Sequence, residues 1–295
     1  MILLDTNQIM ISNLFGLKGK DFNSDDVTLD DVRHSVLKGV LYYNSRFKNE
    51  YGDLVLCYDS GNYWRTDQFP HYKASRKKKQ KISSINWSKI YDLFKSVREE
   101  IKDNLPFVSM YVETVEADDI ISVLVNEFHN HGMGPRQDKT LIVSADKDFQ
   151  QLHRLKGVYQ YSPNTKDFIV CDDPIGFLVD HIIRGDSSDG IPNILSDDDA
   201  LINEDKKQTI MSKKRYNALM EEVKTREIVK EGSDHRRNWF RNKNLIDLEC
   251  IPKDKKKLIS DAFCEASALQ HMKVDKNQMD YLVSNRLGDL TEFLV

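Results

Sequence analysis

The chain has 295 residues, of which 40% are hydrophobic and 31% are charged, and its formal net charge at pH 7 is −4. These values are typical of a soluble globular protein with one large or two modest domains, and the negative balance by itself argues against a nucleic-acid partner. The sequence has no apolar run of transmembrane length, no basic leader before an apolar segment and no CxxC pair. We therefore expect a cytoplasmic protein without a membrane partner, a zinc knuckle or a disulfide framework.

The first 172 residues alternate between short apolar runs and amphipathic segments. Strands are expected at residues 1–5, 53–59, 107–113 and 139–146. A polar stretch follows the first strand, and helices are expected at residues 29–47, at 87–101 and from the sequence VEADDII (115–121) onward. Thr28 is placed to cap the first of these helices. The alternation predicts an α/β fold whose mostly parallel central sheet is flanked by helices on both faces.

The remainder of the chain is helical in pattern and more highly charged. An apolar helix is expected at residues 173–184, and the turn sequence RGDSSDGIP follows it. We therefore expect an α/β domain at residues 1–172, with a basic segment at about 60–86, and a helical region at residues 173–295.

Carboxylates follow the predicted strands and open one of the predicted helices. The candidate metal ligands are Asp5, Asp59, Asp146 and Asp148 after strands, Glu116, Asp118 and Asp119 at a helix start, and Asp186 and Asp189 in the RGDSSDGIP turn. In an open parallel sheet the functional crevice lies at the carboxyl ends of the strands, where most of these acids are expected to meet. Nine like charges in one place would be strongly destabilising, whereas two Mg²⁺ ions would make them a site, because Mg²⁺ takes oxygen ligands.

Each acid also has a purely structural interpretation. An Asp after a strand is often a turn residue or a helix cap, and acids at a helix start suit the positive end of the helix dipole. Any one of these motifs is therefore weak evidence. The five segments together, in this order on this scaffold, favour a metal site.

A run of basic residues lies between the second strand and the helix at 87. The sequence HYKASRKKKQK (71–81) contains Tyr72, Lys73, Arg76, Lys77, Lys78 and Lys79. Such runs are usually solvated loops. The alternative is a nucleic-acid contact, in which Tyr72 stacks on a base and Lys77 to Lys79 guide the phosphate backbone.

The order of the motifs LLDTN, YDSGNYWR, YKASRKKK, VEADDII, SADKDFQQL and GDSSDGIP resembles the 5′-nuclease (flap endonuclease/5′→3′ exonuclease) superfamily. Within it, SGNYWR, QLH and NLIDLECIP (244–252) are most similar to the ribonuclease H branch of T-even-type phages. The resemblance extends over nearly the whole chain, but it is dense only to about residue 192.

This resemblance implies a metal-dependent phosphodiesterase. Asp5, Asp59, Glu116, Asp118, Asp146 and Asp148 match the acids around the first metal ion, and Asp186 and Asp189 match the pair at the second. Asp119 matches a position that varies in the phage branch. Lys73 and Arg76 match basic residues that contact the scissile phosphate, in an arch that admits the 5′ single strand.

The implied reaction is Mg²⁺- or Mn²⁺-dependent 5′→3′ exonuclease and flap endonuclease cleavage that removes RNA primers and adjacent DNA from lagging-strand fragments. The implied substrates are DNA and RNA–DNA hybrids with 5′ ends, flaps or forks. A sliding clamp or a single-strand-binding protein is a candidate partner of a monomeric enzyme, in the host cytoplasm if the chain is phage-encoded. The net charge of −4 is compatible with this, because carboxylates committed to metal ions do not repel DNA as free ones do.

The sequence departs from the family pattern after the GDSSDGIP turn. Members often continue with a Gly-rich hairpin in a helix-three-turn-helix that binds duplex DNA with a monovalent cation. Here the hairpin is missing and Asp197 to Asp199 intervene, so we expect a degenerate form of this motif and leave open whether K⁺ binds. Basic residues at 206–215 either contact phosphates or form a solvated face.

Two alternatives to the nuclease hypothesis remain at this level. A PIN-type ribonuclease shares the acidic α/β core, but such domains are about half as long and lack the basic segment. A non-catalytic, structure-specific DNA-binding protein would keep the scaffold, and the loss of a ligand would have favoured it. All nine candidate acids are present.

Overall fold

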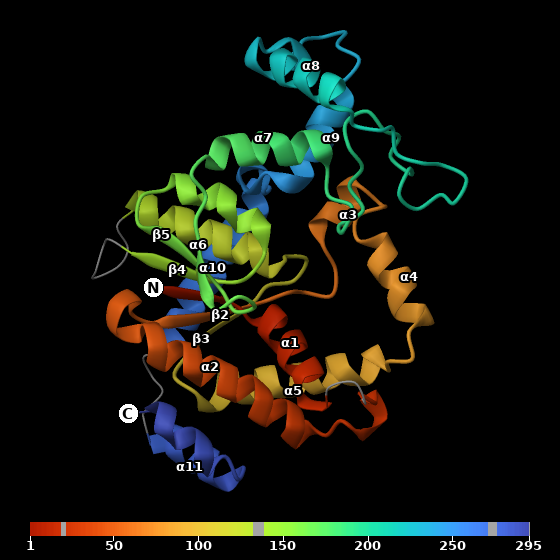
Figure 1. Cartoon of the computed structure of the whole chain (residues 1–295). Coiled ribbons are helices and arrows are strands. Elements are labelled where there is room, and N and C mark those ends of the chain that lie inside the picture. The colour runs from red at the N-terminus through yellow and green to blue at the C-terminus, as the bar shows by residue number, and fades with distance from the viewer. Residues whose placement is uncertain (19–21, 132–138, 271–275, 295) are drawn as a thin grey trace. The chain divides into compact units, whose positions relative to one another are not determined.

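The computed structural model describes residues 1–18, 22–131, 139–270 and 276–294 (Figure 1). The chain forms two compact units. The sheet unit comprises Met1–Gly61, Ser84–Val170 and Lys253–Val295, and the helical unit comprises Asn62–Ser83 and Cys171–Pro252. Among the described helices, none is long and apolar enough to cross a membrane.

A six-stranded sheet forms the centre of the sheet unit. Its strands are β1 (Ile2–Asp5), β2 (Leu54–Tyr58), β3 (Val108–Tyr111), β4 (Thr140–Val143), β5 (Val158–Ser162) and β6 (Asp167–Ile169), in the order β3-β2-β1-β4-β5-β6. All neighbours are parallel except β6, which runs antiparallel to β5. Every residue of β1 and β2 is buried, as expected for strands covered on both faces. The predicted mostly parallel sheet is confirmed.

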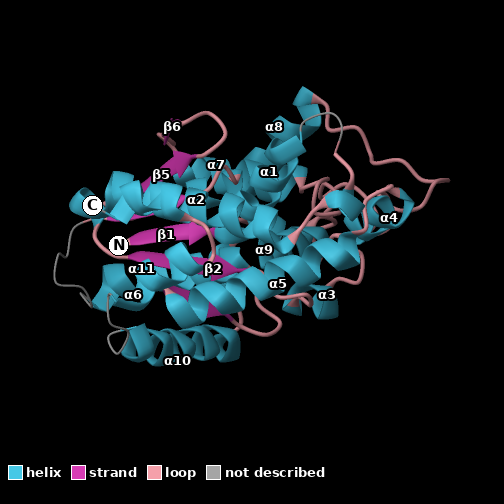
Figure 2. Cartoon of the chain, turned by 90° about the horizontal axis from the view of Figure 1, so that it is seen from below, coloured by secondary structure: helices cyan, strands magenta, loops and turns pink. Residues whose placement is uncertain are grey.

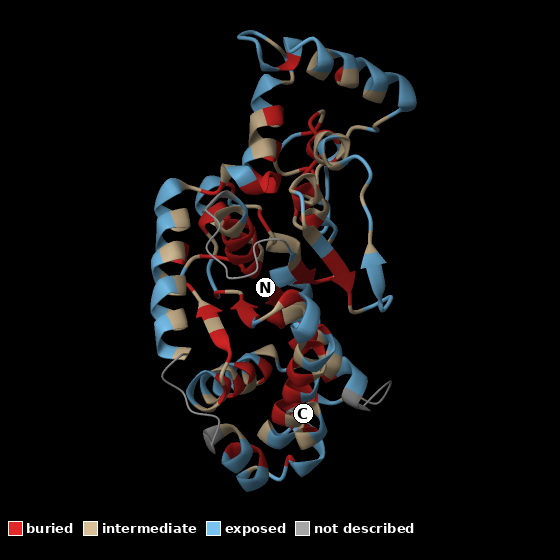
Figure 3. Ribbon diagram, turned by 90° about the vertical axis from the view of Figure 1, so that its left-hand side faces the viewer, coloured by how far each residue is buried: buried red, intermediate tan, exposed pale blue. Residues whose placement is uncertain are grey.

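Helices cover both faces of this sheet (Figures 1 and 2). One face carries α1 (Thr6–Lys18), α2 (Leu29–Tyr51) and α5 (Trp87–Asn104), and the other carries α6 (Ala117–His131) and α10 (Lys253–Gln270). On α5 the buried side chains are Ile90, Phe94, Val97 and Ile101, whose spacing of three to four residues puts them on one helical face. Figure 3 shows the same pattern of buried residues in the strands and exposed residues on the outer helix faces.

The start of α2 follows the predicted cap. Thr28 Oγ1 accepts a hydrogen bond from Asp31 N (3.2 Å), and Asp31 Oδ2 accepts one from Thr28 N (3.0 Å). This capping box pairs two amide groups that the first helical turn leaves without partners. The polar stretch after β1 is a helix, α1, which the sequence analysis did not predict. The strands β5 and β6 were not predicted either.

The carboxyl-terminal segment belongs to the sheet unit. The helix α10 packs against β3 and α6, Gln270 Nε2 donates to Pro106 O (2.7 Å) and Lys255 Nζ donates to Thr114 Oγ1 (2.8 Å). The helix α11 (Lys276–Ser284) is joined to α5 through Tyr281. The compact units therefore follow a different division from the predicted boundary near residue 172, because apolar residues of α10 and α11 complete the core around the sheet. The DNA-binding role given to residues 173–295 stays a prediction.

The helical unit contains α3 (Trp64–Gln68), α4 (Ala74–Ile82), α7 (Pro174–Arg184), α8 (Lys213–Lys224) and α9 (Arg236–Ile246). Its core includes Phe69, Ile183 and Trp239. The predicted helix at 173–184 is present as α7. Residues 185–212, all of which the structure describes, form turns and one isolated bridge before α8 begins. The helix-three-turn-helix interpretation of this segment stays a prediction.

Candidate metal centre and nucleic-acid contacts

Three predicted ligands lie at one edge of the sheet. Asp5 is the last residue of β1, Asp59 follows β2 and Asp146 follows β4. The strands run parallel with Asp5 in register with Cys57 and Leu4 in register with Val143, so their carboxyl ends lie side by side. The strand order changes direction between β1 and β4: β2 and β3 lie on one side of β1, and β4 to β6 lie on the other. Open α/β sheets place their functional crevice at this switch point.

Hydrogen bonds fix the carboxylates of Asp5 and Asp59. Asp5 Oδ1 accepts from Gln8 N (3.1 Å) and Oδ2 accepts from Ser144 Oγ (3.0 Å), so β1 and the segment after β4 are linked through one carboxylate. Asp59 Oδ1 accepts from Ala117 N (2.8 Å), the first residue of α6. The two acids therefore have defined orientations before any ligand binds.

The electrostatics of Asp5 reflect its burial and the charges of neighbouring acids. Burial, the negative charge of Asp59 and, to a smaller extent, that of Asp146 raise its pKa from 3.8 to about 7, against the opposing hydrogen bonds from Gln8 and Ser144. The neighbouring Cys57 thiol has its pKa raised by burial and by the charges of Asp5, Asp118 and Asp59. A carboxyl group in this position is costly to ionise without a compensating cation.

The acids at the start of α6 divide into buried and partly exposed groups. Glu116 and Asp119 are 1% and 0% exposed, and Asp119 Oδ2 accepts from Glu116 N (3.2 Å). Asp119 thus has the structural role of closing the first turn of α6, in addition to any role as a ligand. Asp118 is half-buried. The structural and the metal-binding interpretations of this segment are compatible.

Asp146 and Asp148 begin a short 3-10 helix (Lys147–Arg154), which Asp146 caps by accepting from Asp148 N (2.9 Å). The loop before this helix is held by two glutamines. Gln160 Nε2 donates to Ser144 O (2.9 Å) and Asp146 O (2.7 Å), and Gln8 Oε1 accepts from Ala145 N (2.7 Å). These supporting residues were missed in the sequence, although a glutamine within the apolar strand β5 is a detectable signal.

The other two predicted ligands lie in the helical unit, in the turn after α7. Asp186 is 5% exposed, and its Oδ1 accepts from Ser188 N (2.8 Å) and Ser188 Oγ (2.6 Å). Its Oδ2 lies 3.2 Å from His181 Nε2. Seven of the nine predicted acids thus belong to the sheet unit and two to the helical unit.

Asp189 binds residues 72–76, at the start of the basic run. Its carboxylate forms ion pairs with Arg76 and with Lys73 Nζ (3.7 Å), and its Oδ2 accepts from Tyr72 Oη (3.2 Å). Lys73 N donates to Asp189 O (2.7 Å), which fixes the backbone as well. Gly190 has φ +76°, and a Cβ there would lie 2.6 Å from His71 O, so only glycine allows this close approach.

The structure corrects the expectation that Tyr72 stacks on a base. Tyr72 is 4% exposed and packs in the core of the helical unit, with the Lys73 ammonium 5.1 Å from the centroid of its ring. An aromatic ring stacks on a base only through an accessible face. Tyr72 instead orients Asp189 and shields the ion pairs around it.

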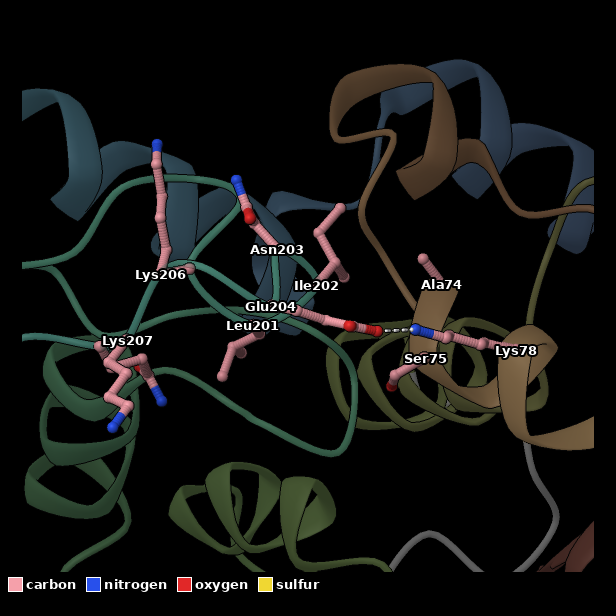
Figure 4. Close-up of a pocket in the computed structure, with 11 residues that line it drawn as sticks. Ala74, Ser75, Lys78, Leu201, Ile202, Asn203, Glu204, Lys206 and Lys207 are labelled. Carbon is pink, nitrogen blue, oxygen red and sulfur yellow. Dashed lines mark hydrogen bonds and ion pairs between the residues drawn. The ribbon is translucent and has the colours of Figure 1, made fainter.

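The remaining lysines of the segment lie on α4. Lys77, Lys78 and Lys79 are exposed, and Lys78 Nζ lies 2.6 Å from Glu204 Oε1. This pair crosses a hollow of about 570 Å³ between α4 and residues 200–208, whose rim also carries Lys206 and Lys207 (Figure 4). Exposed pairs of this kind contribute little to stability, so breaking the Lys78–Glu204 pair costs little free energy.

The donor set fits a hard divalent cation. The candidate ligands of the sheet unit are all carboxylates, several of them buried and held by hydrogen bonds. Oxygen ligands of this kind suit Mg²⁺ and Mn²⁺, whereas zinc sites usually include sulfur or several imidazoles. Among the described residues, the basic side chains of the 72–79 segment offer contacts for an anionic substrate.

Comparisons with known proteins agree with this geometry. A family model described as the N-terminal resolvase-like domain of 5′-3′ exonucleases matches residues 1–175. The ribonuclease H of Enterobacteria phage T4 is 29% identical over 258 residues, which cover 85% of this chain and 81% of the phage protein. A 5′-3′ exonuclease of Streptomyces coelicolor is 26% identical over 213 residues, which cover 65% of this chain and 66% of that protein.

Solved structures share the fold. A flap endonuclease of bacteriophage T5, in a pseudo-enzyme-product complex with DNA and metal ions, matches with a TM-score of 0.62 and 17% identity over 90% of this chain and 98% of its own. The T5 5′-exonuclease with bound zinc ions matches with a TM-score of 0.62 and 17% identity over 90% and 99% of the two chains.

Proposed function

This chain belongs to the 5′-3′ exonuclease family and is a nuclease, and from that premise we propose that it is a Mg²⁺-dependent 5′→3′ exonuclease and flap endonuclease. Its proposed role is the removal of RNA primers and adjacent DNA from lagging-strand fragments. The similarity to the ribonuclease H of phage T4 supports the action on RNA in hybrids. The fold shared with a T5 flap endonuclease that was solved with DNA and metal ions supports the action at 5′ flaps.

The observation that carries the proposal is the set of acids at the carboxyl ends of β1, β2 and β4. The pKa of Asp5 is raised to about 7 by burial and by Asp59, so the ionised cluster requires positive charge. Bound divalent ions would activate a water and stabilise the leaving oxygen of the phosphodiester. We propose two Mg²⁺ or Mn²⁺ ions, with Asp5, Asp59, Glu116, Asp118, Asp119, Asp146 and Asp148 around the first and Asp186 and Asp189 near the second.

The supporting residues hold these carboxylates in place. Ser144 binds Asp5 and also accepts from Asp146 N (3.0 Å), so it joins two ligands. Gln160 is fully buried and holds the backbone between them. A site assembled in this way loses little free energy to reorganisation when the substrate binds.

The basic segment has the proposed role of binding the phosphate backbone. Lys73 and Arg76 contact the scissile phosphate in this proposal, and Lys77 to Lys79 provide attraction that does not depend on sequence. Their interaction with Asp189 sets their position in the structure. The substrates are DNA and RNA–DNA hybrids with 5′ ends, flaps or forks, and we propose that the enzyme acts as a monomer in the cytoplasm of the host, with a sliding clamp or a single-strand-binding protein as candidate partners.

The test uses two substrates, a 5′-labelled DNA flap and a nicked RNA–DNA hybrid, each incubated with the protein in Mg²⁺ and in EDTA. Release of short products from the 5′ end in Mg²⁺ alone is the expected result, and product lengths separate exonuclease from flap cleavage. The variant Asp146→Asn keeps an oxygen that can accept from Asp148 N, so it is expected to bind the flap normally and to cleave at least about a hundredfold more slowly.

A matched control is Asp103→Asn, because Asp103 is an exposed acid on α5. It is expected to cleave like the wild-type protein. Binding of both substrates without cleavage in Mg²⁺ or Mn²⁺ would contradict the proposal and favour a DNA-binding protein that keeps the scaffold.

A further inference from the structure

The backbone after α7 presents several carbonyl groups to one place. Residues 192–196 lie outside regular structure, and the carbonyl oxygens of Pro192, Asn193 and Ser196 all accept hydrogen bonds from the side chain of Arg241 on α9. Carbonyl groups that converge on one point are the arrangement with which proteins hold a desolvated monovalent cation such as K⁺. Here a guanidinium group takes that place.

All three nitrogens of the guanidinium are used. Nη2 donates to Pro192 O (2.9 Å) and Asn193 O (3.2 Å), Nη1 donates to Ser196 O (3.2 Å) and Asp198 Oδ1 (2.6 Å), and Nε donates to Asn242 Oδ1 (2.9 Å). The Arg241 side chain is 8% exposed. A planar fork of donors can satisfy several fixed acceptors at once, whereas a lysine ammonium cannot reach the same set.

The charge of this group is balanced locally. Asp198 is 31% exposed and pairs with both Arg241 and the exposed Arg237. Asp198 is the central one of the three acids at 197–199 that interrupt the family pattern, and its partner is Arg241. Asp198 and the carbonyl groups of the turn thus bind the same arginine side chain.

Contacts of the neighbouring Asn242 and of the backbone hold the turn that carries Asp186 and Asp189. Asn242 is fully buried, and its Nδ2 donates to Ile182 O (2.8 Å) at the end of α7 and to Pro192 O (2.9 Å). Ile191 N donates to Asp186 O (2.7 Å) and Ile194 N donates to Ile183 O (3.1 Å). The order of residues 185–196 thus depends on the side chains of Arg241 and Asn242.

We propose that Arg241 is the resident cation of this turn, so that the protein orders residues 185–196 without a bound monovalent metal ion. Arg241 is then a positioning residue for Asp186 and Asp189. The assignment concerns cation dependence and stands apart from the reaction proposed above, because its readouts need neither nucleic acid nor a divalent ion.

The experiment compares the wild-type protein with Arg241→Ala, Arg241→Lys and the control Arg237→Ala, all in EDTA. Melting temperature and the exchange of the Ile191 and Ile194 amide hydrogens are measured in KCl, NaCl and tetramethylammonium chloride at equal ionic strength. Arg237 shares Asp198 but is 69% exposed, so it tests the loss of a positive charge without the carbonyl contacts.

The wild-type protein is expected to give the same values in all three salts. In Arg241→Ala, exchange at Ile191 and Ile194 is expected to accelerate at least about tenfold, equivalent to about 1.4 kcal/mol, while Arg237→Ala stays close to the wild type. Millimolar guanidinium, or K⁺ more than tetramethylammonium, is expected to restore part of the protection in Arg241→Ala. Arg241→Lys is expected to fall between the wild type and Arg241→Ala.

Specific stabilisation of the wild-type protein by K⁺ would overturn the proposal, because the carbonyl groups would then bind the metal ion. Equal exchange in Arg241→Ala and Arg237→Ala would overturn it as well. If Arg241→Ala does not fold, the salt comparison on the wild-type protein and on Arg241→Lys still decides.

Discussion

At the scale of single residues, the candidate site combines ionised groups that repel each other with hydrogen bonds that hold them in place. Asp5 accepts two hydrogen bonds, which favour its charged form, yet burial and Asp59 raise its pKa to about 7. Burial and the repulsion from Asp59 together therefore outweigh the two hydrogen bonds. A protein keeps such an arrangement when a bound cation reverses the balance.

Replacing Asp5 tests this balance without measuring catalysis. In EDTA, Asp5→Asn is expected to unfold at a higher temperature than the wild type. The gain in the free energy of unfolding is at most about 4 kcal/mol, which corresponds to a pKa raised from 3.8 to about 7. Mg²⁺ or Mn²⁺ is expected to stabilise the wild type and to have a smaller effect on Asp5→Asn. Thermal unfolding with and without the divalent ion measures both, with Asp103→Asn as the control. A wild-type protein that does not respond to either ion would contradict a metal centre here.

The basic residues make different contacts, so their replacements should have different effects. Lys73 is 12% exposed on its side chain and is held by Asp189, whereas Lys81 at the end of α4 is exposed. Lys73→Ala is expected to slow single-turnover cleavage at least about tenfold with a smaller loss of affinity, because in the proposed function Lys73 contacts the reacting phosphate. Lys81→Ala is expected to weaken binding modestly and to lower its salt dependence. Unchanged turnover in Lys73→Ala would contradict the assigned contact.

The positions of the acids could be predicted from the sequence, but their partners could not. An acid directly after an apolar strand is visible in the chain, and parallel strands place such residues at one edge. The contacts of Ser144, Gln8 and Gln160 depend on side chains that meet only in the folded sheet. The same holds for Tyr72, which lies between α3 and α4 and is buried in one core with Phe69 and the α7 residue Ile183.

At the scale of elements, segments with a strong apolar pattern were predicted correctly as strands or helices. The strands β1 to β4 and the helices α2, α5, α6 and α7 have long apolar patterns or clear caps, and each was expected from the sequence. The strands β5 and β6 are partly exposed, and β6 has only three residues and pairs antiparallel with β5. Local sequence carries little information on such pairing. The helix α1 was missed because polar residues such as Asn7, Gln8 and Ser12 obscure its apolar face.

The helix α11 is held on the sheet unit by a charged cluster that gives a pH-dependent contact. Arg33 donates to both oxygens of Glu100, from Nε (2.6 Å) and Nη2 (2.9 Å), and Tyr281 Oη donates to Glu100 Oε2 (2.7 Å). The hydrogen bonds and charge of Arg33, with the Tyr281 hydroxyl, lower the pKa of Glu100 below 4.5, against the opposing effect of burial. A lowered pKa means that the contact stabilises the fold above pH 4.5 and is lost as the pH falls through the folded-state pKa.

Glu100→Gln is therefore expected to lower the free energy of unfolding at pH 7 by about 1–3 kcal/mol and to reduce its dependence on pH between 5 and 3. The matched control is Glu99→Gln, because Glu99 pairs with the adjacent Arg98 and its side chain is 48% exposed. Denaturant unfolding at several pH values measures the slopes, and amide exchange in α11 shows whether that helix detaches first. Equal slopes for Glu100→Gln and the wild type would contradict the role of this cluster.

At the scale of the whole molecule, the carboxyl-terminal residues return to the unit that contains the amino terminus. The sheet unit is built from three separate stretches of the chain, the last of which is Lys253–Val295. A linear sequence suggests a linear division into domains, so the helical pattern after residue 172 was assigned to one region. Only tertiary packing shows that α10 covers the sheet beside α6.

Two neighbouring residues of α10 test this arrangement. Ile259 is fully buried and Leu258 is 43% exposed. Ile259→Ala is expected to destabilise the sheet unit by about 2–5 kcal/mol through lost burial and a cavity, whereas Leu258→Ala is expected to change stability by less than about 0.5 kcal/mol. Amide exchange measured in β3 and in α9 reports on the two units separately. Ile259→Ala is expected to exchange faster in β3, because a cavity first loosens the core that contains it. Faster exchange in α9 alone would instead place α10 with the helical unit.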